Sequence, residues 1–131
     1  MTARHLLAIV ELGGYPNFAP VYEAAGYAVT VVTSMRKALA LIRRDPPDVV
    51  VAEYNYQHVF RDRSSNLETL LSALQRLPQV QLIVFYEREQ EARLADLARR
   101  RPIAARLAYP FDAGTLRAAL DGLAPSPAGR A

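Results

Sequence analysis

The sequence predicts an α/β protein in which a five-stranded parallel sheet is covered by helices on both faces. Strand-like and helix-like segments alternate five times along the chain, which favours parallel strands joined by right-handed crossovers. The strand-like segments are apolar without polar alternation, as expected for a sheet that is buried on both faces. The length of 131 residues is that of one compact domain.

Five short runs rich in Val, Ile and Leu are the predicted strands. They cover residues 6–10, 28–32, 49–52, 81–86 and, more weakly, 103–108. The carboxyl ends of parallel strands share one edge of the sheet, and ligands bind at that edge where the strand order reverses. The residues expected near this edge are Glu11, Glu53, Tyr86 and Tyr109.

Helix signals fill the first two intervals between these strands. The first helix is predicted to begin near residues 17–20 and to be short, because glycines and prolines, among them Pro20, crowd this interval. Ser34 is placed to cap a second helix. Asp45 and the two prolines after it end that helix.

The third interval carries the clearest helix signature. Ser65 and Glu68 match a capping box, and an apolar stripe follows, formed by Leu67, Leu70, Leu71 and Leu74. Residues 87–101 predict a fourth helix, and Asp112 is placed to cap a fifth. We expect one domain over residues 1–123 and a disordered tail or linker remnant over residues 124–131.

Composition excludes several classes of site. The chain has no cysteine, which removes disulfides and thiolate chemistry. Its two histidines lack spaced partners, so no metal site is expected. The longest apolar run near the start is too short for a signal-peptide core or a membrane span. We therefore expect a cytoplasmic protein without membrane contact.

The net charge of +3 comes from arginines spread over the chain, which argues against nucleic-acid binding. The densest cluster, at residues 99–101, lies at a predicted helix C-terminus, where the helix dipole favours cations. We rank capping above phosphate binding for this cluster. Weak nucleic-acid binding stays open as an alternative, through Arg93, Arg99, Arg100 and Arg101.

Residues 5–123 also carry an ordered set of short motifs. Glu11 closes the first strand, EAAGYAV follows the first helix, PPDVVVAE ends in an acid at the third strand, and YPFD precedes the last helix. In order and spacing these motifs resemble the receiver domain of two-component response regulators. The resemblance implies a flavodoxin-like fold with strand order 2-1-3-4-5. It also implies a cis peptide bond between Tyr109 and Pro110.

Receivers accept a phosphoryl group with a fixed set of residues. The resemblance places their acidic pair at Glu11 and Leu12, their acceptor aspartate at Glu53, their hydroxyl at Tyr86 and their lysine at Tyr109. Each position is altered. An aliphatic side chain cannot coordinate Mg²⁺, a longer acid displaces the attacking oxygen, and tyrosine supplies no ammonium. We therefore expect no catalysis, no metal and no cofactor.

Two questions about this altered pocket stay open in the sequence. Glu53 either imitates a phosphorylated aspartate or is a residual polar residue at a strand end. We favour the second, because a carboxylate has less charge and fewer oxygens than a phosphoryl group. The tyrosines near it either fill vacated space, which we favour, or form a surface for a ligand or partner.

Two surfaces are candidates for partner binding. The loop after the third strand is longer than receivers normally have, and long exposed loops commonly carry recognition. Its candidate contact residues are Tyr54, Tyr56, His58, Phe60 and Arg61. A possible homodimer face lies on the fourth helix, fifth strand and fifth helix, where receivers commonly dimerise. Its candidate residues are Arg93, Arg100 and Arg106.

The function predicted from the sequence is that of a phosphorylation-independent pseudo-receiver. Such a protein is a non-catalytic protein–protein interaction module in bacterial signal transduction. One alternative is a small-molecule or nucleotide sensor that uses a tyrosine-lined pocket at the carboxyl edge of the sheet. The other is the weak nucleic-acid binder described above.

Overall fold

The computed structural model describes residues 4–11, 16–54 and 66–123. These residues form a sheet of five parallel strands in the order β2-β1-β3-β4-β5, which confirms the predicted fold class. Each strand overlaps the apolar run that predicted it. The strands are β1 (Arg4–Ile9), β2 (Tyr27–Val32), β3 (Val49–Glu53), β4 (Gln81–Glu87) and β5 (Ala105–Tyr109). The predicted tail, residues 124–131, lies outside the described ranges.

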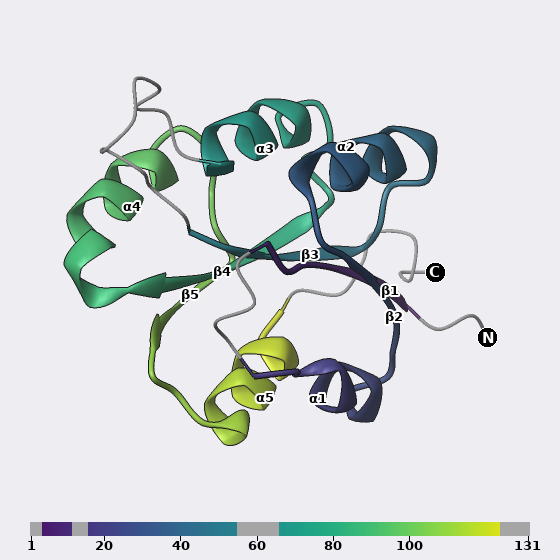
Figure 1. Cartoon of the computed structure of the whole chain (residues 1–131), viewed down its shortest axis with the longest axis vertical. Coiled ribbons are helices and arrows are strands. Elements are labelled where there is room, and N and C mark those ends of the chain that lie inside the picture. Colours follow the sequence, from purple (N-terminus) through teal and green to yellow (C-terminus); the bar gives the residue numbers. More distant parts are fainter. Residues whose placement is uncertain (1–3, 12–15, 55–65, 124–131) are drawn as a thin grey trace.

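Helices cover both faces of the sheet (Figure 1). One face carries α1 (Ala19–Ala24) and α5 (Ala113–Asp121). The other face carries α2 (Met35–Arg44), α3 (Asn66–Leu74) and α4 (Glu91–Ala98), and the short turn η1 (Arg88–Gln90) leads into α4. Among the described residues, each helix is too short or too polar to cross a bilayer.

Local signals explain where the helices begin. The Ser34 hydroxyl accepts a hydrogen bond from the backbone N–H of Lys37 at 3.2 Å. The Asp112 carboxylate accepts one from the backbone N–H of Thr115 at 2.8 Å, so both predicted N-caps are confirmed. α1 is short, as predicted, with six residues and a proline in its first turn. Ser65, the first residue of the predicted capping box, lies outside the described residues.

Strand side chains alternate between two apolar cores. Leu7, Ile9 and Tyr86 belong to the core under α2, α3 and α4. Ala8, Val51 and Phe85 belong to the core under α1 and α5. The predicted apolar stripe of α3 is buried in the first of these cores, as expected. The alternation also decides on which face a side chain at the end of a strand lies.

Candidate functional site

Glu53 is the last residue of β3, and its side chain is 4% exposed. Because side chains alternate along a strand, Glu53 lies on the same face as Val51, the face covered by α1 and α5. Its register partner on β4 is Phe85. The β1–β3 pairing runs as far as Ile9 and Ala52, so Val10 follows beside Glu53 where the strand order reverses.

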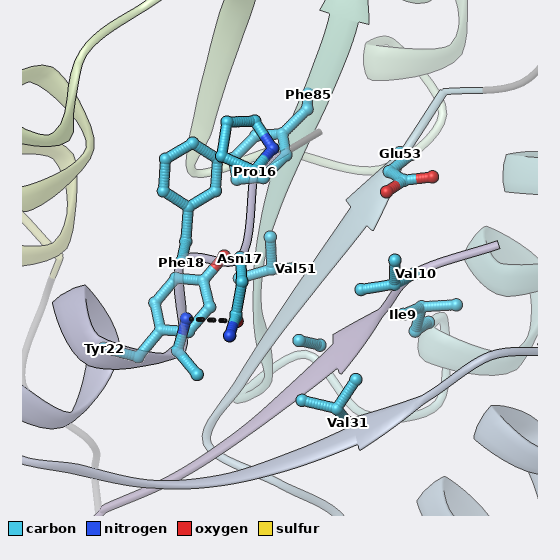
Figure 2. A pocket seen from close by; sticks show the side chains of 12 residues that line it. Ile9, Val10, Pro16, Asn17, Phe18, Tyr22, Val31, Val51, Glu53 and Phe85 are labelled. Carbon is cyan, nitrogen blue, oxygen red and sulfur yellow. Dashed lines mark hydrogen bonds between the residues drawn. The ribbon is translucent and has the colours of Figure 1, made fainter. Parts of the chain in front are cut away.

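A cavity of about 380 Å³ opens at this edge, between β1, β3 and the start of α1. Figure 2 shows Glu53 near Val10 on one side of the cavity, with Phe18 and Tyr22 on the other. The volume falls within the usual range for small-ligand pockets, about 300–1,000 Å³. Glu53 is the charged member of the described lining, which is otherwise apolar, aromatic or neutral. The lining residues are Ala8, Ile9, Val10, Pro16, Asn17, Phe18, Ala19, Tyr22, Val31, Val51, Glu53 and Phe85.

Tyr22 comes from α1, and its side chain is buried. Burial raises the pKa of the Tyr22 phenol, and the nearby Glu53 carboxylate raises it further. The hydroxyl therefore stays protonated and is able to donate a hydrogen bond. Tyr22 was not among the predicted site residues. The signal that could have found it is its place in a short helix that begins with Pro20 and ends before Gly26.

Three phenylalanines pack together next to the cavity. The ring centroids of Phe18 and Phe85 are 5.6 Å apart in an edge-to-face arrangement. Phe111 lies 5.4 Å from Phe18 and 4.9 Å from Phe85. Such contacts stabilise one another beyond the area that they bury. These three residues were not predicted either, because they come from three separate segments of the chain.

Tyr86 does not share the cavity with Glu53, which corrects the predicted pocket. The register pairs Glu53 with Phe85, so the next residue, Tyr86, points to the opposite face. There it is buried in the core under α4, and its hydroxyl donates to the Glu91 carboxylate at 3.5 Å. A shift of one residue along the strand therefore places Phe85, and not Tyr86, beside Glu53.

The remaining pocket residues are also dispersed. Tyr109 ends β5 and packs edge-on against Phe111, with ring centroids 5.8 Å apart. The predicted cis peptide bond between Tyr109 and Pro110 is confirmed. Glu11 follows β1 and is partly exposed. Leu12 lies outside the described residues, so its placement in the pocket stays a prediction.

Tyr54 is wrongly predicted as an exposed recognition residue. Its side chain is 6% exposed and belongs to the core under α2, α3 and α4. Its backbone N–H donates to the Phe85 carbonyl at 2.7 Å, which extends the β3–β4 ladder by one residue and turns the ring inward. The other residues of the predicted partner-binding loop lie outside the described ranges. These are Tyr56, His58, Phe60 and Arg61.

The predicted dimer face is exposed, but its arginines differ from their neighbour Arg101. Arg93 on α4, Arg100 after α4 and Arg106 on β5 are all exposed. Arg101 is buried and donates hydrogen bonds to backbone carbonyls. One of the three arginines at residues 99–101 therefore has a structural role, and the cluster exposes less positive charge than its sequence indicates.

The described residues that line this cavity do not fit Mg²⁺. The ion requires several oxygen ligands in octahedral geometry. The described lining supplies one carboxylate, that of Glu53, next to the isopropyl group of Val10. Within the described ranges, His, Asp and Glu side chains form no group of three that could hold a metal ion. No metal-dependent step follows from this arrangement.

Comparison with known proteins shows similarity in structure but not in sequence. No family model matches the sequence, and no curated protein is significantly similar to it. Among solved structures, a response regulator receiver domain protein from Clostridium thermocellum has a TM-score of 0.69 at 20% identity, over 90% of this chain and 91% of that chain. The chemotaxis protein CheY4 from Vibrio cholerae has a TM-score of 0.72 at 17% identity, over 92% and 98%.

A longer protein shows the same likeness. NtrX from Brucella abortus, solved in complex with ADP, has a TM-score of 0.69 at 18% identity, over 92% of this chain and 27% of that chain. The chain therefore spans about a quarter of NtrX. At these identities the likeness establishes that the chain has the fold of receiver domains.

Proposed function

We propose that this chain is a phosphorylation-independent receiver-like module that acts by binding a protein partner in bacterial signal transduction. It keeps the receiver scaffold and uses its surface for recognition, without accepting a phosphoryl group at Glu53. Its partner is a signalling protein. A second copy of this chain, in a homodimer, is one such partner.

The donor set around Glu53 is the observation that carries this proposal. Phosphoryl transfer depends on a metal ion and on cations that stabilise the transferring group. In this chain the strand-end position beside Glu53 holds Val10, and the rest of the described lining is apolar or neutral. The position that the resemblance gives to the receiver lysine holds Tyr109, which packs against Phe111. The cation of the lysine is therefore missing from this position, and Leu12 takes one of the two places of the acidic pair that the resemblance predicts.

Glu53 is assigned a structural role within this proposal. Its side chain is 4% exposed and lies below the surface that a protein partner would contact. A carboxylate at this depth presents its charge to Tyr22 and the cavity and offers little surface to a partner. The proposal therefore assigns recognition to exposed residues, with Arg93, Arg100 and Arg106 as its candidates.

Incubation with Mg²⁺ and acetyl phosphate tests the absence of phosphoryl transfer. An ordinary receiver domain treated in parallel gains one phosphoryl group, which intact-mass spectrometry detects. The wild-type chain is expected to keep its mass. A stoichiometric, acid-labile adduct that disappears in the Glu53→Gln variant would overturn the proposal.

Partner binding is tested by crosslinking the chain in lysate of its source organism. Partners captured by the wild type are expected to be lost with Arg93→Glu, Arg100→Glu or Arg106→Glu, and to be retained with Glu53→Gln. Loss of the same partners with Glu53→Gln alone would instead support the interpretation in which Glu53 imitates a phosphorylated aspartate.

A further inference from the structure

We propose that the groove between α2 and α3 binds an acidic amphipathic helix of a partner protein. The apolar side chains of that helix enter the groove, and its carboxylates meet Arg43 and Arg76. This inference goes beyond the proposed function, which assigns recognition to Arg93, Arg100 and Arg106 on other elements.

α2 and α3 lie side by side on one face of the sheet (Figure 1). A groove of about 450 Å³ lies between the C-terminal parts of the two helices, and its volume is within the usual range for binding pockets, about 300–1,000 Å³. On the side of α3, the groove is lined by the short side chains of Ser72 and Ala73. These side chains leave room for a side chain that comes from outside the protein.

The floor of the groove is apolar. Ile42 is 1% exposed and belongs to the core under α2, α3 and α4. Leu77 packs against the same core and is partly exposed, and Pro46 is exposed. Apolar side chains of a partner would remove this surface from water. An amphipathic helix does so with residues at positions i, i+3, i+4 and i+7, which is a common way of binding to a groove.

The groove has a cation on the side of each helix. Arg43 of α2 and Arg76, which follows α3, line the groove and are exposed. Neither forms an ion pair with another described residue, and none of the described lining residues is acidic. The positive charge of this region favours a partner that carries carboxylates. α2 as a whole has four cations and no acid, the cations being Arg36, Lys37, Arg43 and Arg44.

Acidic side chains do not offset this charge. Asp45 follows α2 and lines a different cavity, and Glu68 lies in the first turn of α3, at the opposite end of that helix from Arg76. Counting both acids, this region still has more cations than acids. The segments outside the described ranges contain one acidic side chain, Asp62, and three arginines. Those segments therefore add more positive than negative charge to the chain.

The apolar floor favours a protein partner over a nucleic acid or a membrane. Binding to a phosphate backbone depends on cations and gives no role to Pro46 and Leu77. A helix that lies on a membrane buries its own apolar face in the lipid. The apolar face of α2 is already in the protein core, where Ala38 is 0% and Ile42 is 1% exposed.

Four synthetic peptides of about fifteen residues, long enough to form a helix, test this assignment. Three have leucines at positions i, i+3, i+4 and i+7, and their polar positions hold glutamate, glutamine or lysine. The fourth is the glutamate peptide with alanine in place of each leucine. Amide chemical shifts of ¹⁵N-labelled wild-type protein at Arg43, Ser72 and Leu77 report binding.

The glutamate peptide is expected to bind, and the lysine peptide is expected not to bind. The glutamine peptide is expected to bind about tenfold more weakly than the glutamate peptide, because it lacks the charges that face the arginines. The peptide without leucines is also expected to bind at least about tenfold more weakly, because it buries less apolar surface.

Three variants separate contacts in the groove from the net charge of the protein. Arg43→Glu and Arg76→Glu are each expected to weaken binding of the glutamate peptide about tenfold, because they place like charges opposite each other. Ser72→Tyr fills the groove without a change in charge and is expected to weaken both the glutamate and the glutamine peptide. Arg88→Glu makes the same charge change on the exposed η1 and is the matched control, expected to weaken binding less than about twofold.

Four results would overturn the assignment. They are the absence of shifts at the groove residues with the glutamate peptide, equal binding of the glutamate and lysine peptides, equal binding of the glutamate peptide with and without leucines, and equal losses in Arg43→Glu and Arg88→Glu. Tighter binding at these residues by a DNA duplex or by phosphatidylserine vesicles would also overturn it, in favour of a phosphate-bearing partner. If a variant does not fold, the comparison of the four peptides still decides the question. Phosphorylation of Glu53 by acetyl phosphate would contradict the proposed function alone, since peptide binding is measured without any phosphodonor.

Discussion

The guanidinium group of Arg101 donates a hydrogen bond from Nη2 to the carbonyl oxygen of Val80 at 2.7 Å. The same side chain donates to the carbonyls of Leu74, Leu77 and Pro102. Leu74 is the last residue of α3, and carbonyls at a helix C-terminus lack partners within the helix. Arg101, which is 7% exposed, therefore joins the end of α3 to the turn that leads into β4.

Replacement of Arg101 by methionine is expected to lower the free energy of unfolding by about 2–4 kcal/mol, because buried carbonyls lose charge-assisted hydrogen bonds. Urea unfolding followed by circular dichroism measures this change. Arg100→Met is the matched control, since Arg100 is exposed, and it is expected to change stability by less than about 0.5 kcal/mol. Equal effects of the two substitutions would show that the Arg101 contacts contribute nothing specific.

The sequence was sufficient to predict the fold because its signals are local and repeated. Apolar runs without alternation gave the buried parallel strands, and Ser34 and Asp112 gave two helix starts that the structure confirms. The role of Arg101 could not be predicted in the same way. Three of its four acceptors lie more than twenty residues earlier in the chain, so no local pattern distinguishes it from Arg100.

The candidate site was predicted less completely, for a geometric reason. Motif spacing located Glu53 at the end of β3, and the structure places it beside a cavity. A shift of one residue along a strand moves a side chain to the other face, and the predicted pocket therefore held Tyr86 where the register places Phe85. Phe18 and Tyr22 were missed because their positions depend on how α1 packs.

Gly26 connects α1 to β2 in a backbone conformation that favours glycine. Its φ is +98°, and a Cβ atom built on it would meet nothing within 4 Å. Any loss of stability in Gly26→Ala therefore comes from the positive φ and not from a steric clash. We expect the free energy of unfolding to fall by about 1–2 kcal/mol. Gly122→Ala is the control, since Gly122 has a φ of −83°. A neutral result at position 26 in urea unfolding would contradict the strained-backbone argument.

The raised pKa of the Tyr22 phenol is expected to make the protein less stable at alkaline pH. Burial and the Glu53 carboxylate raise the pKa of its phenol above the usual 10.0. A folded-state pKa above the unfolded one gives stability that is fully present below pH 10.0 and is lost as the pH rises above that value. We expect the melting temperature to fall more steeply above this pH in the wild type than in Tyr22→Phe. If the melting temperatures of the two proteins fell equally with pH above this value, Tyr22 would not be the group responsible.

A second carboxylate beside Glu53, introduced by Val10→Asp, is expected to create a binding site for Mg²⁺. In the wild type, the described residues of the cavity lining supply one carboxylate, that of Glu53, whereas Mg²⁺ needs several oxygen ligands. Adding Mg²⁺ is therefore expected to leave the melting temperature unchanged. Val10→Asp places a second carboxylate beside Glu53, one residue beyond the last register pair of β1 and β3, Ile9 and Ala52. Because an ion that binds only the native state stabilises it, Mg²⁺ is expected to raise the melting temperature of this variant.

Val10→Asn is the matched control for the metal experiment. It has nearly the same shape as Val10→Asp but lacks the second charge, so its melting temperature is expected to respond to Mg²⁺ no more than that of the wild type. A variant that binds Mg²⁺ is stabilised by about 2.7 kcal/mol when the free ion is at one hundred times its dissociation constant. If the wild type were stabilised by Mg²⁺ as much as Val10→Asp, the edge of the sheet would already hold a metal site. Phosphoryl transfer at Glu53 would then have the metal ion that it needs.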